Sequence, residues 1–120
     1  MATSDKTCSI APYFQVSSEN LTAFKSICEQ LVAKSQTEEK CLYYGFSFHE
    51  NMAHCREAYV DGEGLLAHLD NVGDLLTEAL KLAELVKLEI HGPESELAKL
   101  REPLAGFNPD FFVLEYGFRN

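Results

Sequence analysis

Two alternating segments separated by only two residues restrict the fold of this chain more than any other feature. Residues 41–49 and residues 52–60 alternate apolar or aromatic side chains with polar ones, as β-strands with one buried face do. The connection Glu50-Asn51 is so short that the two strands must pair antiparallel. The sequence therefore predicts a β-hairpin in the middle of the chain.

The register of this hairpin decides which side chains share a face. If His49 lies opposite Met52, three cross-strand pairs point to the same side, because side chains alternate with a period of two. These pairs are Tyr44 with Glu57, Leu42 with Tyr59, and Phe46 with Cys55. A shift of the register by one residue would exchange the two faces and turn Glu57 toward solvent.

The remaining apolar patterns predict further strands and helices on both sides of the hairpin. The expected elements are strands at 10–16, 85–91 and 111–118, a helix from Leu21 to about residue 34, a helix from Leu65 to Ala83 that is interrupted near Gly73, and a short helix between Pro93 and Pro103. In the strand at 85–91, the apolar face is expected to carry Val86, Leu88 and Ile90.

The order strand, helix, strand, strand, helix, strand predicts an α+β, ferredoxin-like fold, with an antiparallel sheet and helices on one face. The opposite face of the sheet would carry Tyr13, Tyr43 and Arg56, and a second copy of the chain is the simplest cover for it. We therefore predict a homodimer. Residues 1–8 are expected to form an N-terminal tail, and residues 9–120 a single domain.

Charge and composition exclude several classes of protein. The net charge of −9 argues against nucleic acid as a partner, because phosphate binding needs clustered Lys and Arg. No apolar run reaches the roughly 20 residues that cross a bilayer, and the N-terminus lacks a signal-peptide pattern, so a cytoplasmic protein without membrane contact is expected. The cysteines are then reduced, and their spacing does not favour a metal site. They are Cys8, Cys28, Cys41 and Cys55.

The strand-to-helix segment that follows Glu57 carries the strongest candidates for chemistry. Tyr59 would end the strand, Asp61 would cap the next helix, and His68 would lie roughly two turns into that helix. This geometry can place the phenol and the imidazole at the mouth of one pocket, where proton transfer is possible. We therefore predict His68, Tyr59 and Glu57 as catalytic residues.

The role of each candidate follows from its ordinary acidity. A neutral imidazole is available at pH 7, so His68 can act as a base. Tyr59 or Tyr44 could donate a hydrogen bond to a substrate oxygen, and Glu57 could orient His68 or act as an acid with a raised pKa. The alternative is that His68 is a core or helix-surface histidine and that both tyrosines are plain sheet residues. A carboxylate buried within a strand, by contrast, needs a partner.

Four further residues are expected to line the substrate pocket between sheet and helices. They are Phe14, Leu42, Tyr44 and Phe46. A cavity of several hundred cubic ångströms would suit a ligand, whereas a filled interior would favour a protein without catalysis.

Three pieces of the chain form a pattern that points to a known family. They are Pro12-Tyr-Phe-Gln-Val16 with the helix after it, Cys41-Leu-Tyr-Tyr-Gly-Phe46, and Glu57-Ala-Tyr-Val-Asp61 leading to Ala67-His68-Leu69. The pattern resembles the antibiotic biosynthesis monooxygenase superfamily of dimeric α+β barrel proteins. The resemblance implies a homodimer whose sheets pack face to face, with a pocket between sheet and helices in each subunit.

The resemblance also implies candidate activities. Some members oxidise quinols or aromatic polyketides with O2 and use no flavin or metal, others degrade haem, and many have no assigned activity. The expected function is therefore a cofactor-independent monooxygenase acting on a quinol or a related small phenolic compound. The alternative is a non-catalytic dimer that binds a small ligand or is associated with stress.

The chain departs from the family pattern at three positions. Oxygenases and haem-degrading members commonly have a tryptophan at the end of the third strand, where this chain has Tyr59, and it contains no tryptophan at all. The haem-degrading branch has an asparagine in the first strand and a histidine late in the second helix, where this chain has Pro12 and Leu80. These departures disfavour haem degradation.

Overall fold

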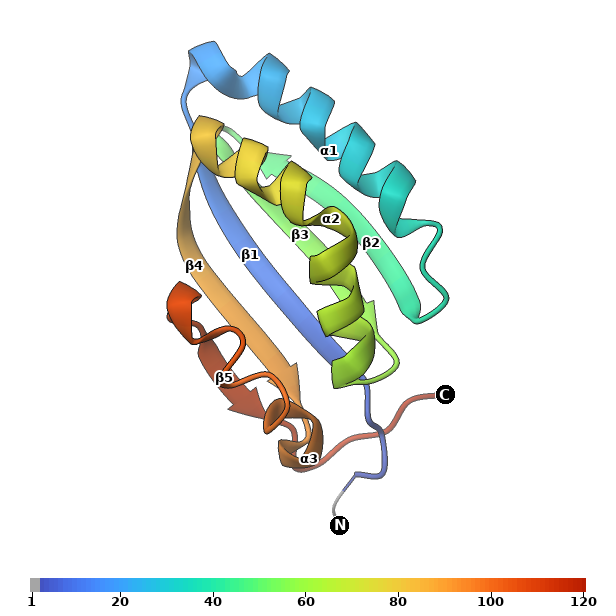
Figure 1. The fold of residues 1–120 in the computed structure, drawn as a ribbon. Helices are drawn as coiled ribbons and strands as arrows, with labels where there is room; N and C mark the ends of the chain where they lie inside the picture. The colour runs from blue at the N-terminus through green and yellow to red at the C-terminus, as the bar shows by residue number, and fades with distance from the viewer. Residues whose placement is uncertain (1–2) are drawn as a thin grey trace.

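A twisted sheet with two long helices across one of its faces organises the molecule (Figure 1). The computed structural model describes residues 3–120, so the first two residues of the expected tail lie outside the described residues. The elements are β1 (Cys8–Val16), α1 (Leu21–Ser35), β2 (Cys41–His49), β3 (Met52–Tyr59), α2 (Gly62–Leu82), β4 (Ala83–Gly92), α3 (Glu94–Leu97) and β5 (Asp110–Val113).

The five strands lie in the order β2-β3-β1-β4-β5. The pairings among the first four strands are antiparallel, whereas β5 runs parallel to β4. The predicted ferredoxin-like α+β fold is therefore confirmed, with the correction that the sheet is mixed. The last strand covers only Asp110–Val113, and the short helix ends at Leu97, so both are shorter than predicted.

The central hairpin has the predicted register except at its open end. Tyr44 lies opposite Glu57, as predicted. The predicted pairing of Leu42 with Tyr59 is wrong, because the register shifts between Cys41 and Tyr43 and places Cys41 opposite Tyr59. Leu42 is 39% exposed as a result. A β-bulge adds one unpaired residue to a strand and turns the side chains beyond it to the other face.

A second bulge changes the apolar face of β4. The pairing with β1 shifts between Tyr13 and Phe14, so that Phe14 lies opposite Leu85. Leu88 is buried as predicted, but Val86 is 46% exposed, and its predicted place on the apolar face is wrong. Leu85 packs against the core instead of Val86.

Helix α2 continues without a break through Gly73, where an interruption was predicted. A glycine inside a helix costs about 1 kcal/mol relative to alanine. Packing of the apolar face offsets that cost, since tertiary contacts supply most of a helix's stability. Leu65, Val72 and Ala79 are all fully buried along this face. The correct part of the prediction is the start of the helix, where Asp61 accepts a hydrogen bond from the Gly64 N–H at 2.8 Å.

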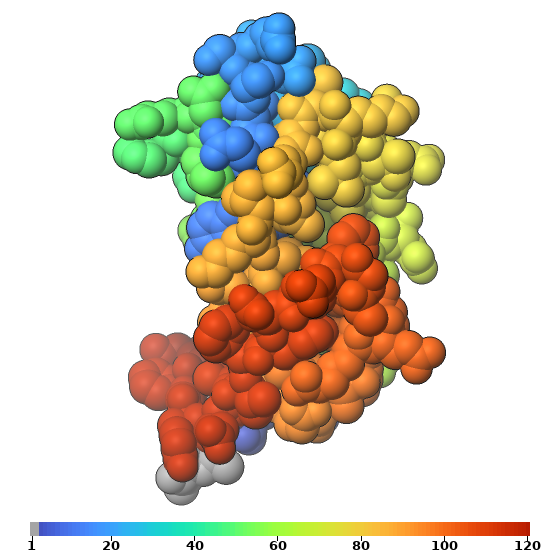
Figure 2. All heavy atoms as spheres, turned by 90° about the vertical axis from the view of Figure 1, so that its left-hand side faces the viewer, coloured from blue at the N-terminus to red at the C-terminus, as the bar shows by residue number. Residues whose placement is uncertain are grey.

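The segment after β4 packs back against the sheet and the start of α2. Figure 2 views the edge formed by β4 and β5 and shows this segment, in orange and red, across the lower part of the molecule. Leu97, Leu100 and Leu104 are buried in one cluster with Tyr59 and Leu65. The segment therefore contributes to the core.

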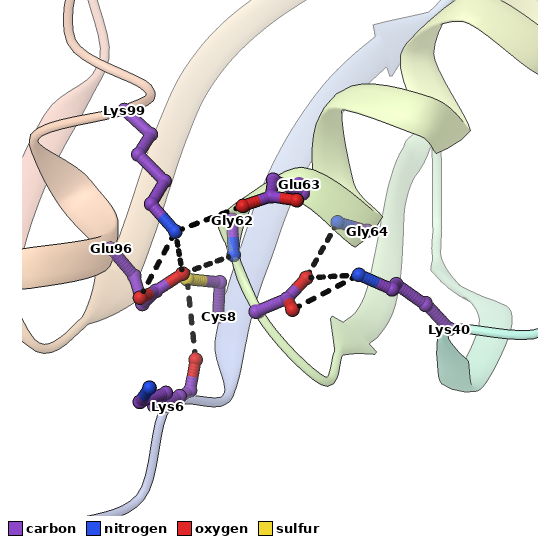
Figure 3. A network of polar contacts seen from close by, with 9 residues as sticks. Lys6, Cys8, Lys40, Gly62, Glu63, Gly64, Glu96 and Lys99 are labelled. Atoms are coloured by element: carbon purple, nitrogen blue, oxygen red, sulfur yellow. Dashed lines mark hydrogen bonds and ion pairs between the residues drawn. The ribbon is translucent and has the colours of Figure 1, made fainter.

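A buried carboxylate fastens this segment to α2 (Figure 3). Glu96 accepts a hydrogen bond from the Gly62 N–H at 2.9 Å, and the Lys99 ammonium lies 3.1 Å from the same oxygen. The hydrogen bond from the Gly62 N–H is the main reason that the pKa of Glu96 is lowered. Together with Asp61, Glu96 satisfies N–H groups that the first turn of a helix leaves without partners.

The face of the sheet away from the helices carries stacked polar and aromatic side chains. The Arg56 guanidinium lies 4.3 Å from the ring centre of Tyr43, and the rings of Tyr13 and His54 stack at 4.3 Å. Tyr43 is 43% exposed. The predicted homodimer, which would cover this face, stays a prediction. Within residues 3–120, no helix is both long and apolar enough to cross a membrane.

Replacement of Glu96 by alanine is expected to lower the free energy of unfolding by about 1–3 kcal/mol, because it leaves the buried Gly62 N–H without an acceptor. Urea denaturation at pH 7 measures the change. Glu94→Ala is the matched control, since Glu94 lies in the same short helix but pairs with Arg101 at the surface. Equal losses in the two variants would contradict the role given to Glu96.

Candidate active site

A polar cluster lies at the inner end of an otherwise apolar cavity between the sheet and α2. The cavity has a volume of about 70 Å³, and its polar lining comes from Glu57 and His68. Leucines of α2 and β4 form much of the wall, and Leu104 and Phe107 of the C-terminal segment complete it. Phe107 is 48% exposed whereas His68 is 2% exposed, so this wall of the cavity reaches the molecular surface at Phe107 while the imidazole is buried.

Glu57 reaches this cavity because the hairpin register turns its side chain toward the helices. Its Oε1 accepts a hydrogen bond of 2.6 Å from the Tyr59 hydroxyl and lies 3.3 Å from His68 Nε2. Burial raises the pKa of the Glu57 carboxyl to about 7, although hydrogen bonds from Tyr59 and Cys55 oppose the rise. Neutral and ionised forms of Glu57 therefore coexist near neutral pH.

His68 lies between two carboxyl groups. Its Nδ1 lies 2.9 Å from Glu38 Oε2 and 3.1 Å from Glu38 Oε1. Burial lowers the pKa of the imidazole, and the contact with Glu38 partly opposes this. In the neutral form favoured by burial, Nδ1–H donates to the Glu38 carboxylate, which leaves the Nε2 lone pair facing Glu57.

Glu38 is a member of the site that the sequence analysis missed. It lies in the connection before β2, within a polar run that gives no local sign of a specific partner. Asn71 holds it by donating from Nδ2 to Glu38 Oε2 at 2.8 Å. Asn71 follows His68 by three residues on α2, and residues three apart share one face of a helix. That spacing is the one signal in the sequence that points to Asn71.

Two tyrosine rings enclose the imidazole. The ring centres of Tyr59 and Tyr44 lie 5.0 Å and 5.2 Å from that of His68. Burial raises the pKa of both phenols, and the charge of Glu57 adds to the rise. Both hydroxyls therefore stay protonated and can act as hydrogen-bond donors.

The structure brings together the three predicted catalytic side chains, although not where they were expected. Tyr59 and His68 were predicted at the mouth of a pocket, but the structure buries both, and of the two only His68 lines the cavity. Tyr59 donates to Glu57 and lies in the core, so its hydroxyl is already engaged. The catalytic roles themselves stay predictions.

Of the four residues predicted to line the pocket, Phe14 alone lines the cavity. Leu42 and Tyr44 border a separate surface hollow beside Glu38, and Phe46 borders another between α1 and β2. The bulge in β2 accounts for Leu42. The cavity is also smaller than the several hundred cubic ångströms that would suit a ligand without rearrangement.

The residues at the cavity offer no set of metal ligands. Within residues 3–120, no group of three or more His, Cys, Asp or Glu side chains is arranged to hold a metal ion. Pro12 and Leu80 both line the cavity, and neither side chain has a group that binds a metal. The chemistry that the cluster can perform by itself is proton transfer, with Glu57 and His68 as acid and base.

Comparison with solved structures identifies a similar protein over nearly the whole chain. MupZ from Pseudomonas fluorescens is 49% identical, the match covers 96% of this chain and 95% of MupZ, and the TM-score is 0.91. No protein-family model and no curated protein sequence matches the chain.

More distant structures share the fold alone. A proposed antibiotic biosynthesis monooxygenase from Nitrosomonas europaea is 16% identical, with 73% of this chain and 90% of that chain covered and a TM-score of 0.67. SnoaB, a cofactor-independent oxygenase from Streptomyces nogalater whose structure is that of a mutant, is 13% identical, with 71% and 88% covered and a TM-score of 0.59. The resemblance to this superfamily is confirmed at the level of the fold.

Replacement of Glu57 by glutamine is expected to stabilise the protein more at pH 8 than at pH 5. Between about pH 4.5 and pH 7 the folded chain keeps a proton on Glu57 that the unfolded chain loses, so this carboxyl lowers the free energy of unfolding as pH rises. A neutral amide removes that loss, which amounts to at most about 3 kcal/mol.

Chemical denaturation at the two pH values measures this difference. Glu84→Gln is the matched control, because it removes a carboxyl from an exposed position on β4. A change in the Glu57→Gln variant that is the same at pH 5 and pH 8 would contradict a raised pKa at Glu57.

Proposed function

Because this chain belongs to the same family as MupZ and has the fold of the antibiotic biosynthesis monooxygenases, we propose that it is a cofactor-independent monooxygenase. Its substrate would be a quinol or a related small phenolic compound. The Glu57–His68 pair would remove the phenolic proton, and the cavity would hold the apolar part of the substrate away from water. A cytoplasmic homodimer is part of this proposal.

The observation that carries the proposal is the burial of a carboxyl and an imidazole in contact at the closed end of an apolar cavity. Burying such groups is unfavourable, and replacing them by apolar side chains of similar size is often neutral or stabilising. A cluster of this kind therefore indicates a use beyond folding. Side chains that line the same hollow can exchange protons with a molecule bound in it.

The proposed chemistry needs a base, a hydrogen-bond donor and a dry site. Loss of the phenolic proton gives an electron-rich anion, which can pass one electron to O2 without a cofactor. The two radicals then combine at a ring carbon into a peroxide anion, which takes back the proton held by the Glu57–His68 pair and becomes a hydroperoxide. Loss of water from this hydroperoxide leaves one oxygen atom in the oxidised product. Glu57 and His68 take up the phenolic proton, and the apolar wall limits competing hydrolysis.

The size of the cavity supports a second candidate, a binding protein without catalysis. A cavity of about 70 Å³ is smaller than the roughly 300–1,000 Å³ of typical ligand sites. A substrate would therefore have to widen it, and the exposed side chains Leu80 and Phe107 on its wall are those with space to move. The buried acid–base cluster weighs against this candidate, because a binding site for an apolar ligand does not need it.

Oxygen consumption with a panel of hydroquinones is expected to exceed the rate without protein, and His68→Ala or Glu57→Gln should reduce it by about tenfold or more. His49→Ala is the control, because His49 is an exposed histidine at the tip of the hairpin. No uptake above background with any phenolic compound would exclude the proposed oxidation. Product formed equally well without O2 would assign the pair to acid–base chemistry alone.

A compound that binds the cavity is expected to raise the melting temperature of the protein by several degrees. Screening by thermal shift, followed by mass spectrometry of the bound compound after incubation in air, separates the two candidates. A tight ligand that is recovered unchanged supports the binding protein, whereas an oxidised product supports the monooxygenase.

A further inference from the structure

The imidazole of His68 connects two carboxyl groups that face different parts of the protein. Nε2 lies 3.3 Å from Glu57 Oε1, whereas Nδ1 lies 2.9 Å from Glu38 Oε2. Glu57 lines the apolar cavity. Glu38 borders a surface hollow of about 420 Å³ that lies beside α1 and the start of β2 and has polar as well as apolar lining. The same ring therefore touches the cavity on one side and a group near solvent on the other.

Water has no evident way to reach Glu57 once the cavity is filled. The Glu57 side chain is 5% exposed, and the wall between it and the exposed Phe107 is built from hydrocarbon side chains. An apolar substrate that occupies the cavity would displace what water is there. A Glu57 carboxyl that still holds its own proton when the substrate binds cannot accept the phenolic proton, so its proton must first leave the cluster by another route.

We infer that Glu38 exchanges protons between this cluster and solvent through His68, so that substrate and protons use different entrances. Substrate would enter past Phe107, and protons would leave by way of Glu38 and the hollow beside β2. The inference rests on the proposed function as far as it concerns turnover. The contacts of His68 on which it depends can be tested without a substrate.

The transfer moves one proton and changes no other bond. A proton on Glu57 adds to the lone pair of Nε2, and the proton on Nδ1 passes to Glu38. Glu57 is then ionised, His68 is again neutral, and Glu38 gives its new proton to water. Reversal of the same steps takes a proton from solvent, returns it to Glu57 and restores the starting tautomer, so the path works in both directions. The geometry suits this use, because the contacts hold Nδ1 and Nε2 toward different carboxyl groups.

The groups around the imidazole favour this path over others. Glu38 from the connection before β2, Glu57 and Tyr59 from β3, and Tyr44 from β2 are the titratable groups that face His68. Burial raises the pKa of both phenols, so neither tyrosine accepts the proton. Asn71 fixes the carboxylate of Glu38 against the ring, which orients Nδ1 toward it. Glu38 is a positioning residue in this scheme, since it acts on the substrate through His68.

The experiment is NMR of the full chain with 15N-labelled histidine, recorded without substrate across a pH series. The wild type is expected to show His68 as the Nδ1–H tautomer at pH 7. Glu38→Gln should abolish this single tautomer and move the titration of His68 to lower pH, because the carboxylate favours the protonated ring. Glu39→Gln is the matched control, since it removes the neighbouring carboxylate, which is exposed. It should leave the His68 signals unchanged.

A second variant separates charge from contact. Glu38→Asp keeps the negative charge but shortens the side chain by one methylene, and it should also lose the fixed tautomer. With a substrate that is turned over, Glu38→Gln should lower kcat with little change in KM, and a small buffer such as acetate should restore kcat in part. An Nε2–H tautomer in the wild type, or His68 signals that do not respond to Glu38→Gln, would overturn the inference whether or not an activity has been found.

Discussion

The burial of the Glu57 carboxyl against the imidazole of His68 is the constraint on which the rest of the arrangement depends. A carboxyl without water must find donors or keep its proton, and here both occur. Tyr59 supplies a donor from the same strand, two residues away, and His68 supplies a ring from the next helix. The charge on His68 is in turn limited by burial and balanced by Glu38. Each member of the cluster therefore has its protonation state set by its neighbours.

The hairpin shows why part of this arrangement can be read from the sequence. A two-residue connection leaves little freedom in the register, so the pairing of Tyr44 with Glu57 followed from counting residues. Strand alternation likewise predicted that Glu57 and Tyr59 share one face of the sheet. The predicted helix cap at Asp61 then placed His68 close to them. Local constraints of this kind depend on few residues, and the predicted register holds from the turn as far as Tyr43.

The parts that could not be predicted depend on packing between distant segments. The bulges at Leu42 and Val86 insert one residue each, and no turn residue or change in composition at these positions predicts them. Glu38 meets His68 only after α1 and α2 have packed together, which sequence separation does not reveal. The dimensions of the cavity depend on how closely the leucines of α2 and β4 approach the C-terminal segment.

The C-terminal segment has a further consequence for how this site can change. The segment after β4 supplies Leu104 and Phe107 to the cavity, and its Glu96 holds the first turn of the helix that bears His68. Remodelling of this wall during evolution is thereby coupled to the position of the imidazole. A lineage that exchanges this segment must therefore also rebuild the beginning of α2 and repack the core around Leu104.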